Sequence, residues 1–333
     1  MKPFRVLVAA TAALLALSAC SSDSSEDPET TSGDATGGES DGAFPATVTT
    51  AFGDVTIPEQ PERIVALGWG DAETALALGF QPVGASDWLE FGGEGVGPWA
   101  EGLYETPPEI IATLEPSFEA IGSLEPDLIL DVKSSGDQDR YDRLSQIAPT
   151  VGVPAGGESY LTTTEAQVEM IAAALGVPEK GEELLANVDT AFEEAAQAHP
   201  DWAGKTVTAA TKTSEGWGAY IEDSARVQFL ERLGFAHSPT IAELPANAGG
   251  FSVDISSEQL DLLDADLIVA FPIYLETTEI TEDPLWQQVP AVADGRAIVV
   301  DGDLSDAYSL GSALSIEYAI DNLTPLIEDA IGS

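Results

Sequence analysis

The chain of 333 residues contains little cysteine and little positive charge. Its single cysteine, Cys20, excludes an internal disulfide bond. Only 12 Lys and Arg stand against 58 Asp and Glu, which gives a formal net charge of −46. Nucleic-acid binding needs a basic surface, so this balance excludes DNA and RNA as partners. It suits an exported protein, because external salt screens the self-repulsion of an acidic surface.

Histidine and the familiar catalytic motifs are also scarce. The two histidines, His199 and His237, are far apart, and no cysteine follows Cys20, so a Cys/His metal site is not expected. Walker, Ser-x-x-Lys and His-Glu-x-x-His patterns are missing from the sequence. The glycine-rich 92–97 precedes Pro98 rather than a helix and is expected to be a loop. These absences favour a binding protein over an enzyme.

The first nineteen residues have the layout of an export signal. Lys2 and Arg5 precede an apolar run, 6–16, that is too short to span a bilayer as a mature helix. The run closes on Leu-Ser-Ala-Cys at 17–20, which resembles the lipobox of bacterial lipoproteins. The resemblance implies a signal peptide over 1–19 and a diacylglyceryl group on Cys20. Two acyl chains would anchor the protein to the outer face of the cytoplasmic membrane. The alternative is an ordinary secretory signal with a chance cysteine.

A flexible tether is expected over 20–43. From 21 to 42 the chain consists of Ser, Thr, Gly, Asp and Glu with Pro28 and Ala35. Such a segment buries too little apolar surface to offset its ordering entropy. The tether would let a folded body move near the membrane that holds it.

The remaining residues, about 290, suffice for two domains of ordinary size and alternate between short β-rich runs and helical ones. The strands expected in the first half are 63–69, 82–88, 127–133 and 149–154. Those expected in the second half are 205–213, 266–274 and 295–303. Strands that alternate with helices imply βαβ units and mainly parallel sheets, an α/β fold.

An uninterrupted amphipathic helix is predicted between the two halves. Leu184, Val188 and Phe192 lie along one stripe of a segment of about 20 residues, on the order of 30 Å long. We therefore expect an N-terminal lobe over 44–176, a linking helix over 177–200 and a C-terminal lobe over 201–333. A single stiff linker predicts small hinge motion. The final helix is expected to bend or break at Pro325.

Three segments in order, 53–86, 121–136 and 255–271, resemble the solute-binding lipoproteins of ABC importers for iron-siderophores and vitamin B12. They read "GDVTIPEQPERIVALGWGDAETALALGFQPVGAS", "IGSLEPDLILDVKSSG" and "ISSEQLDLLDADLIVAF". The resemblance implies two Rossmann-like lobes with mostly parallel sheets, bridged by one long helix as in class III periplasmic binding proteins. It also implies a monomer that delivers its ligand to a permease and its ATPase.

The same resemblance implies two docking residues. In that family one exposed glutamate on each lobe enters an arginine pocket of the permease, and the matching positions here are Glu73 and Glu258. Two carboxylates on rigid lobes would steer and orient docking. The alternative is that each glutamate merely favours the first turn of its helix.

Aromatic and basic residues follow the expected strands at their carboxyl ends, where open α/β sheets bind ligands. They are Trp69, Trp88, Lys133 and Tyr160 in the first lobe and Lys212, Trp217, Tyr220, Arg226, Tyr274 and Tyr308 in the second. Some of these, notably Trp88 and Tyr220, could instead pack under loops. Trp202 and Trp286 are expected to be structural, and Arg140 is expected to pair with acids on the surface.

An aromatic cleft with two or three cations suits a bulky chelate whose charge is largely neutralised. A ferric hydroxamate of neutral or single charge fits it better than a triply anionic catecholate. Iron would be bound only as a siderophore chelate, with no resident metal or cofactor. Cobalamin and haem are the alternatives, because fold does not fix ligand. Haem would need an axial ligand such as Tyr160, Tyr220 or Tyr274.

Overall fold

A computed structural model describes residues 43–157 and 159–332 of the chain. The predicted signal peptide, Cys20 and nearly all of the predicted tether lie outside these residues. Contacts group Gly42–Ser333 into one compact unit that contains two separate large sheets. Within the described part, no helix combines the length and apolarity needed to cross a membrane.

The first sheet has five parallel strands in the order β5-β4-β3-β6-β7. The strands are β3 (Ile64–Ala66), β4 (Gly84–Ser86), β5 (Glu109–Ile111), β6 (Leu128–Leu130) and β7 (Thr150–Val151). Its helices are α1 (Asp71–Ala77), α2 (Phe118–Ser123), α3 (Gln138–Leu144) and α4 (Thr164–Ala174), with a short 3-10 helix Pro98–Ala100. An antiparallel hairpin of β1 (Ala46–Thr50) and β2 (Gly53–Ile57) precedes them. The apolar triplets of β3 and β6 are buried on both faces, as expected for parallel strands covered by helices. We call this part the first lobe.

The second sheet has six strands, β11-β9-β8-β12-β13 with β10 beside β8, and is mostly parallel. They are β8 (Thr206–Thr213), β9 (Gly216–Tyr220), β10 (Ala236–His237), β11 (Ser252–Ile255), β12 (Leu267–Pro272) and β13 (Ala297–Val299). The antiparallel member β9 forms a hairpin with β8. The helices are α6 (Ala225–Arg232), α7 (Pro239–Ala242), α8 (Thr278–Thr281), α9 (Pro290–Ala293) and α10 (Gly302–Leu310), with 3-10 helices Pro200–Trp202, Ser257–Leu263 and Trp286–Gln288. We call this part the second lobe.

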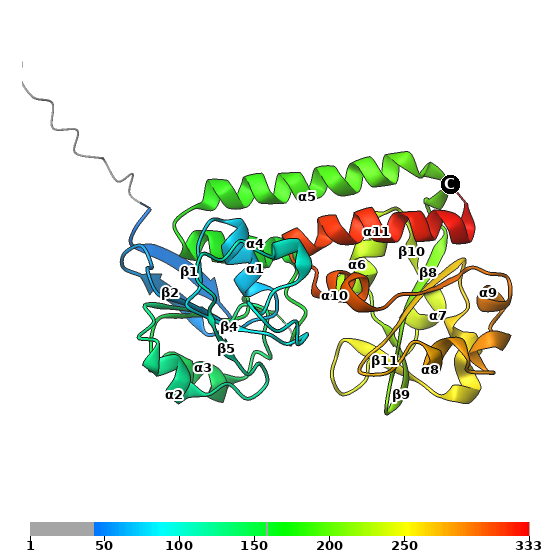
Figure 1. The fold of residues 1–333 in the computed structure, drawn as a ribbon, viewed down its shortest axis with the longest axis horizontal. Helices are drawn as coiled ribbons and strands as arrows, with labels where there is room; N and C mark the ends of the chain where they lie inside the picture. The colour runs from blue at the N-terminus through cyan, green and yellow to red at the C-terminus, as the bar shows by residue number, and fades with distance from the viewer. Residues whose placement is uncertain (1–42, 158, 333) are drawn as a thin grey trace, which may run out of the picture. The chain divides into compact units, whose positions relative to one another are not determined.

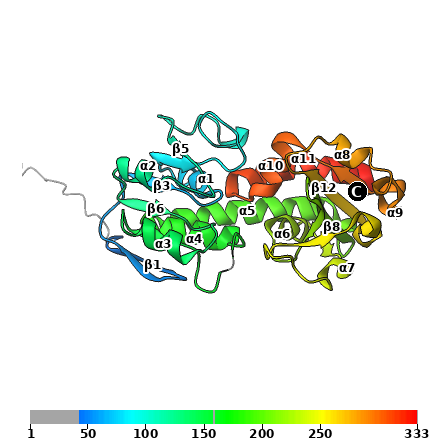
Figure 2. The same cartoon turned by 90° about the horizontal axis from the view of Figure 1, so that it is seen from below.

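Two long helices complete the fold. Helix α5 (Pro178–Ala198), of 21 residues, runs from the first sheet to the second, as Figures 1 and 2 show. It buries Val188 and Phe192 from the predicted stripe. The last helix, α11 (Ala313–Ile331), continues through Pro325. Of the bend or break expected there, the break is wrong and the bend stays a prediction. Burial of Leu323 and Ile327 on either side of the proline holds the helix together.

Candidate ligand-binding site

Three aromatic rings meet at the carboxyl edge of the first sheet. Trp69 follows β3, Trp88 follows β4 and Tyr160 follows β7. The ring centroid of Trp69 lies 4.0 Å from that of Trp88, with an interplanar angle of 9°, and 4.0 Å from that of Tyr160, with an angle of 25°. All three side chains are half-buried. Neither indole Nε1 has an acceptor among the described residues. We call Trp88, Trp69 and Tyr160 the aromatic stack.

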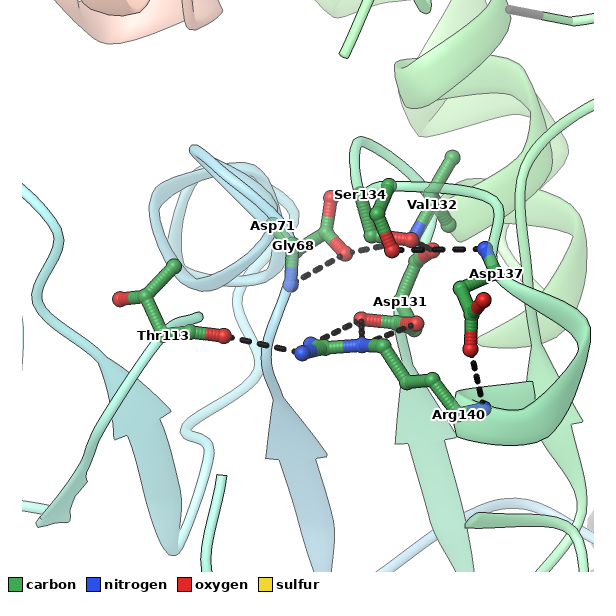
Figure 3. Close-up of polar contacts among 9 residues, drawn as sticks. Gly68, Asp71, Thr113, Asp131, Val132, Ser134, Asp137 and Arg140 are labelled. Carbon is green, nitrogen blue, oxygen red and sulfur yellow. Dashed lines mark hydrogen bonds and ion pairs between the residues drawn. The ribbon is translucent and has the colours of Figure 1, made fainter. Parts of the chain in front are cut away.

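A buried carboxylate fixes the loop that carries Trp69. Asp71 accepts hydrogen bonds from the backbone N of Gly68 at 3.2 Å and of Val132 at 2.8 Å. The side-chain Nε2 of Gln167 donates to Asp71 at 2.6 Å and to the carbonyl oxygen of Trp69 at 2.8 Å. These bonds tie the ends of β3 and β6 together, as Figure 3 shows for Gly68 and Val132. Burial raises the pKa of Asp71 to about 6.

An ion pair that the sequence did not reveal lies at the same edge. The Nη2 of Arg140 is 2.7 Å from Oδ1 of Asp131, and their side chains are 10% and 4% exposed. Nη1 of the same arginine donates to the carbonyl oxygen of Thr113 at 2.9 Å (Figure 3). The expected surface pairing of Arg140 is therefore wrong, because its partner ends the buried strand β6 rather than lying on the same helix. The sequence did hold one indication of this buried pair, because Asp131 directly follows an apolar strand, a position that lies near the core.

Lys133 does not point freely into a cleft. Its Nζ donates to the carbonyl oxygen of Leu310 at 3.2 Å, at the end of α10. The neighbouring carbonyl of Gly311 accepts a bond of 2.7 Å from Oγ1 of Thr164. Burial and the positive charge of Arg226 lower the pKa of Lys133 to about 8. This predicted ligand contact therefore holds the turn between α10 and α11 against the first lobe.

Glu73 is buried rather than exposed. Its side chain, 3% exposed, accepts hydrogen bonds from Oγ of Ser312, from Nε1 of Trp99 at 2.8 Å and from N of Gly97 at 3.3 Å. The expectation of an exposed docking carboxylate is thus wrong here, because the start of α11 covers it. Burial raises its pKa to about 7. Glu258, in the first turn of its 3-10 helix, is exposed, and its docking role stays a prediction.

Several predicted contacts in the second lobe belong to its core. Trp217 is buried and stacks on Trp286, with ring centroids 5.1 Å apart. Tyr308 is also buried, and its hydroxyl donates a hydrogen bond of 3.0 Å to the carbonyl oxygen of Arg226. Neither ring meets the expectation of an open aromatic face, because Trp217 packs against the 3-10 helix Trp286–Gln288 and Tyr308, on α10, packs against Phe229 of α6. Trp202 is fully buried, as expected of a structural residue.

Lys212 and Tyr274 lie at the end of the second sheet with different environments. Nζ of Lys212 pairs with Oδ2 of Asp283 at 3.1 Å and donates to the carbonyl oxygen of Glu279, so this cation is already neutralised. Tyr274, just after β12, is 79% exposed and free to contact a ligand.

Arg226 retains unused hydrogen-bonding capacity. Its guanidinium carbon lies 4.7 Å from the ring centroid of Tyr220, a cation–π contact. Its Nε has no acceptor among the described residues. Tyr220 is buried, and its ring stacks on Phe271. Of the predicted cations, Arg226 is the best placed to donate to a bound anion or carbonyl oxygen.

A hollow of about 700 Å³ extends along β8, β9 and β11 beside Tyr220. We call it the β9 trough. Its lining residues are Thr211, Thr213, Glu215, Gly216, Trp217, Gly218, Tyr220, Asn247, Phe251, Ser252, Asp254, Ile255, Ser256, Gln259 and Ile273.

Comparison with known proteins places this arrangement among binding proteins. Residues 64–304 match the family described as "Periplasmic binding protein". The chain is 31% identical over 306 residues to the probable siderophore-binding lipoprotein YfiY of Bacillus subtilis, covering 87% of each chain.

Two solved structures share the fold. The iron uptake substrate-binding protein PiaA of Streptococcus pneumoniae, in complex with ferrichrome, is 27% identical with a TM-score of 0.74, covering 86% of this chain and 98% of that one. A periplasmic solute binding protein of Mycobacterium smegmatis is 30% identical with a TM-score of 0.74, covering 86% and 99%.

Proposed function

The chain belongs to the periplasmic binding protein family, and on this premise we propose that it captures a ferric siderophore, of hydroxamate type, at the carboxyl ends of its two sheets. It then delivers the chelate to an ABC permease and its ATPase. The lipid on Cys20 would hold it at the outer face of the cytoplasmic membrane, and exposed Glu258 would dock on the permease.

The aromatic stack is the observation that carries this proposal. The three stacked rings present their edges and the outer faces of Trp88 and Tyr160 at one end of the sheet, an apolar surface against which a bulky chelate can pack. Their position after β3, β4 and β7 is where open α/β sheets bind ligands.

The cations of the site support a ligand of low charge. Lys212 is neutralised by Asp283, and Lys133 is buried and donates to a backbone carbonyl group, so Arg226, whose Nε lacks an acceptor among the described residues, is the predicted cation best placed to meet a ligand. A triply anionic catecholate would bring charges that one arginine leaves uncompensated. A neutral or singly charged ferric hydroxamate brings no more negative charge than one arginine can compensate.

The relatives support a ferric siderophore as the substrate. One is named for siderophores, and a solved relative was captured with ferrichrome. Two of the three tyrosines considered for haem are poorly placed, because Tyr160 is stacked on Trp69 and Tyr220 is buried. Tyr274 is exposed, but the relatives named for siderophores favour a ferric siderophore over haem and cobalamin, so neither alternative is proposed.

Titration of the chain from Ser21 onward with a panel of ligands tests the function. We expect a ferric hydroxamate to quench tryptophan fluorescence saturably at one site per chain, while the iron-free hydroxamate does not. Ferric catecholate should bind at least about tenfold more weakly, a difference of about 1.4 kcal/mol. A catecholate that binds more tightly than every hydroxamate would contradict the ligand type. If no ferric chelate changes the tryptophan fluorescence, the proposed function is contradicted.

A further inference from the structure

The β9 trough lies on one face of the second sheet, beyond the helices that cover that face. Gly218 pairs with Thr211 on one side and with Asp254 on the other, and directly opposed residues share a face. On the same face, Tyr220 and Phe271 are buried in a cluster with α6 and α10. The trough is therefore the uncovered continuation of the surface that carries Tyr220 and, above it, Arg226.

Glycines keep the trough open. A Cβ at Gly216 would meet no atom within 4 Å. A Cβ at Gly218 would lie 3.3 Å from the carbonyl oxygen of Val253 and 3.5 Å from Cγ2 of Thr211. Because neither glycine carries a side chain, the space above β9 stays open to a ligand.

Charge in the trough is negative. Glu215 and Asp254 both line it and are exposed, whereas its described lining contains no lysine, arginine or histidine. A positively charged group would find opposite charges there, and a carboxylate would find like charges.

Several polar groups of the trough already have hydrogen-bond partners within the protein. Asn247 donates from Nδ2 to Oγ of Ser252 at 2.9 Å and to Oδ1 of Asp254 at 3.1 Å, and Thr211 donates to the carbonyl oxygen of Phe271 at 3.1 Å. Oδ1 of Asp254 thus already accepts one hydrogen bond, while the carboxylate of Glu215 and Oδ2 of Asp254 have lone pairs left for a ligand that donates hydrogen bonds.

We infer that the β9 trough receives an arm of the chelate that ends in a protonated amine. The inference rests on the proposed function and narrows its substrate to hydroxamates whose ferric core is neutral and whose arm is cationic. The ammonium group lies between Glu215 and Asp254, while the core contacts the aromatic stack and Arg226. The excess of acidic residues in the chain also favours the approach of such a cation.

Ferrioxamine B and its N-acetyl derivative test the inference, because they share one ferric chelate and differ in the charge of the terminal amine. We expect calorimetry on the chain from Ser21 onward to give at least about tenfold tighter binding of the amine form, and a preference that shrinks as salt screens the pair. The double variant Glu215→Gln/Asp254→Asn should lose most of the preference. The variant Asp261→Asn, which removes an exposed carboxylate of the same lobe outside the trough, should keep it.

The outcomes separate the inference from the function. Equal affinity for the two chelates, or a preference that the double variant retains, would overturn the inference and leave the proposed function standing. If no ferric chelate binds the wild-type protein, both are overturned. Thermal unfolding of each variant shows whether its fold is kept, and the salt dependence of the wild-type preference needs no variant at all.

Discussion

Replacing Trp69 with alanine is expected to weaken the binding of a ferric hydroxamate about a hundredfold, because large aromatic anchors contribute about 2–4 kcal/mol at a binding site. Trp69 is the middle ring of the aromatic stack, with Trp88 on one face and Tyr160 on the other. Its loss removes apolar contact area and leaves both neighbouring rings without support. Calorimetry measures the change without depending on the fluorescence of the residue removed.

Two variants control for this result. Trp69→Phe keeps a ring between Trp88 and Tyr160 and should cost only a few-fold in affinity. Tyr141→Ala removes a ring of the same lobe that stacks on Phe52, with ring centroids 4.0 Å apart, and is not part of the aromatic stack, so it should leave affinity unchanged. If the Trp69→Ala protein remains folded and binds like the wild type, the aromatic stack is not the ligand surface.

Acidification from neutral pH is expected to stabilise the protein. The folded-state pKa of Glu73 is raised from 4.5 to about 7 by burial, so its contribution to stability is fully present below pH 4.5 and lost as pH rises through about 7. A shift of this size corresponds to roughly 3 kcal/mol. Asp71 and Asp306, whose pKa values burial raises to about 6, act in the same direction. Urea unfolding across this pH range measures the effect.

The variant Glu73→Gln isolates the contribution of that residue. The free energy of unfolding of the variant should rise relative to that of the wild type, by up to about 3 kcal/mol, as pH rises through the range where the buried acid ionises, because only the wild type loses stability there. Glu183→Gln removes one charge from an exposed position of α5 and should leave the pH profile unchanged. A profile that Glu73→Gln does not flatten would show that Glu73 has an ordinary, solvated carboxylate.

The sequence predicted the fold well because its determinants are local. Short apolar runs such as β3 and β6 alternate with helices, and the stripe that includes Val188 and Phe192 marks α5. The family match confirms the resemblance read from three sequence segments, and with it the expectation of a binding protein rather than an enzyme. The lobe boundaries and the fate of Cys20 stay predictions.

The site was predicted in part, and its failures share one cause. Parallel strands put Trp69, Trp88 and Tyr160 at one edge, so their proximity could be expected, although stacking could not. Glu73 has the same sequence context whether solvated or buried, and it is covered by Ser312, 239 positions later. Lys212 is neutralised by a residue 71 positions away. Sequence periodicity carries no information on such distant partners.

Amide hydrogen exchange with and without a ferric hydroxamate tests the central claim most directly, because it reports on both lobes at once. The account predicts protection on binding at the loops that carry Trp69, Trp88 and Tyr160 and, in the same experiment, along β9 and the start of α6 around Arg226. Protection confined to one lobe, or located away from the carboxyl ends of the two sheets, would contradict a chelate held by both.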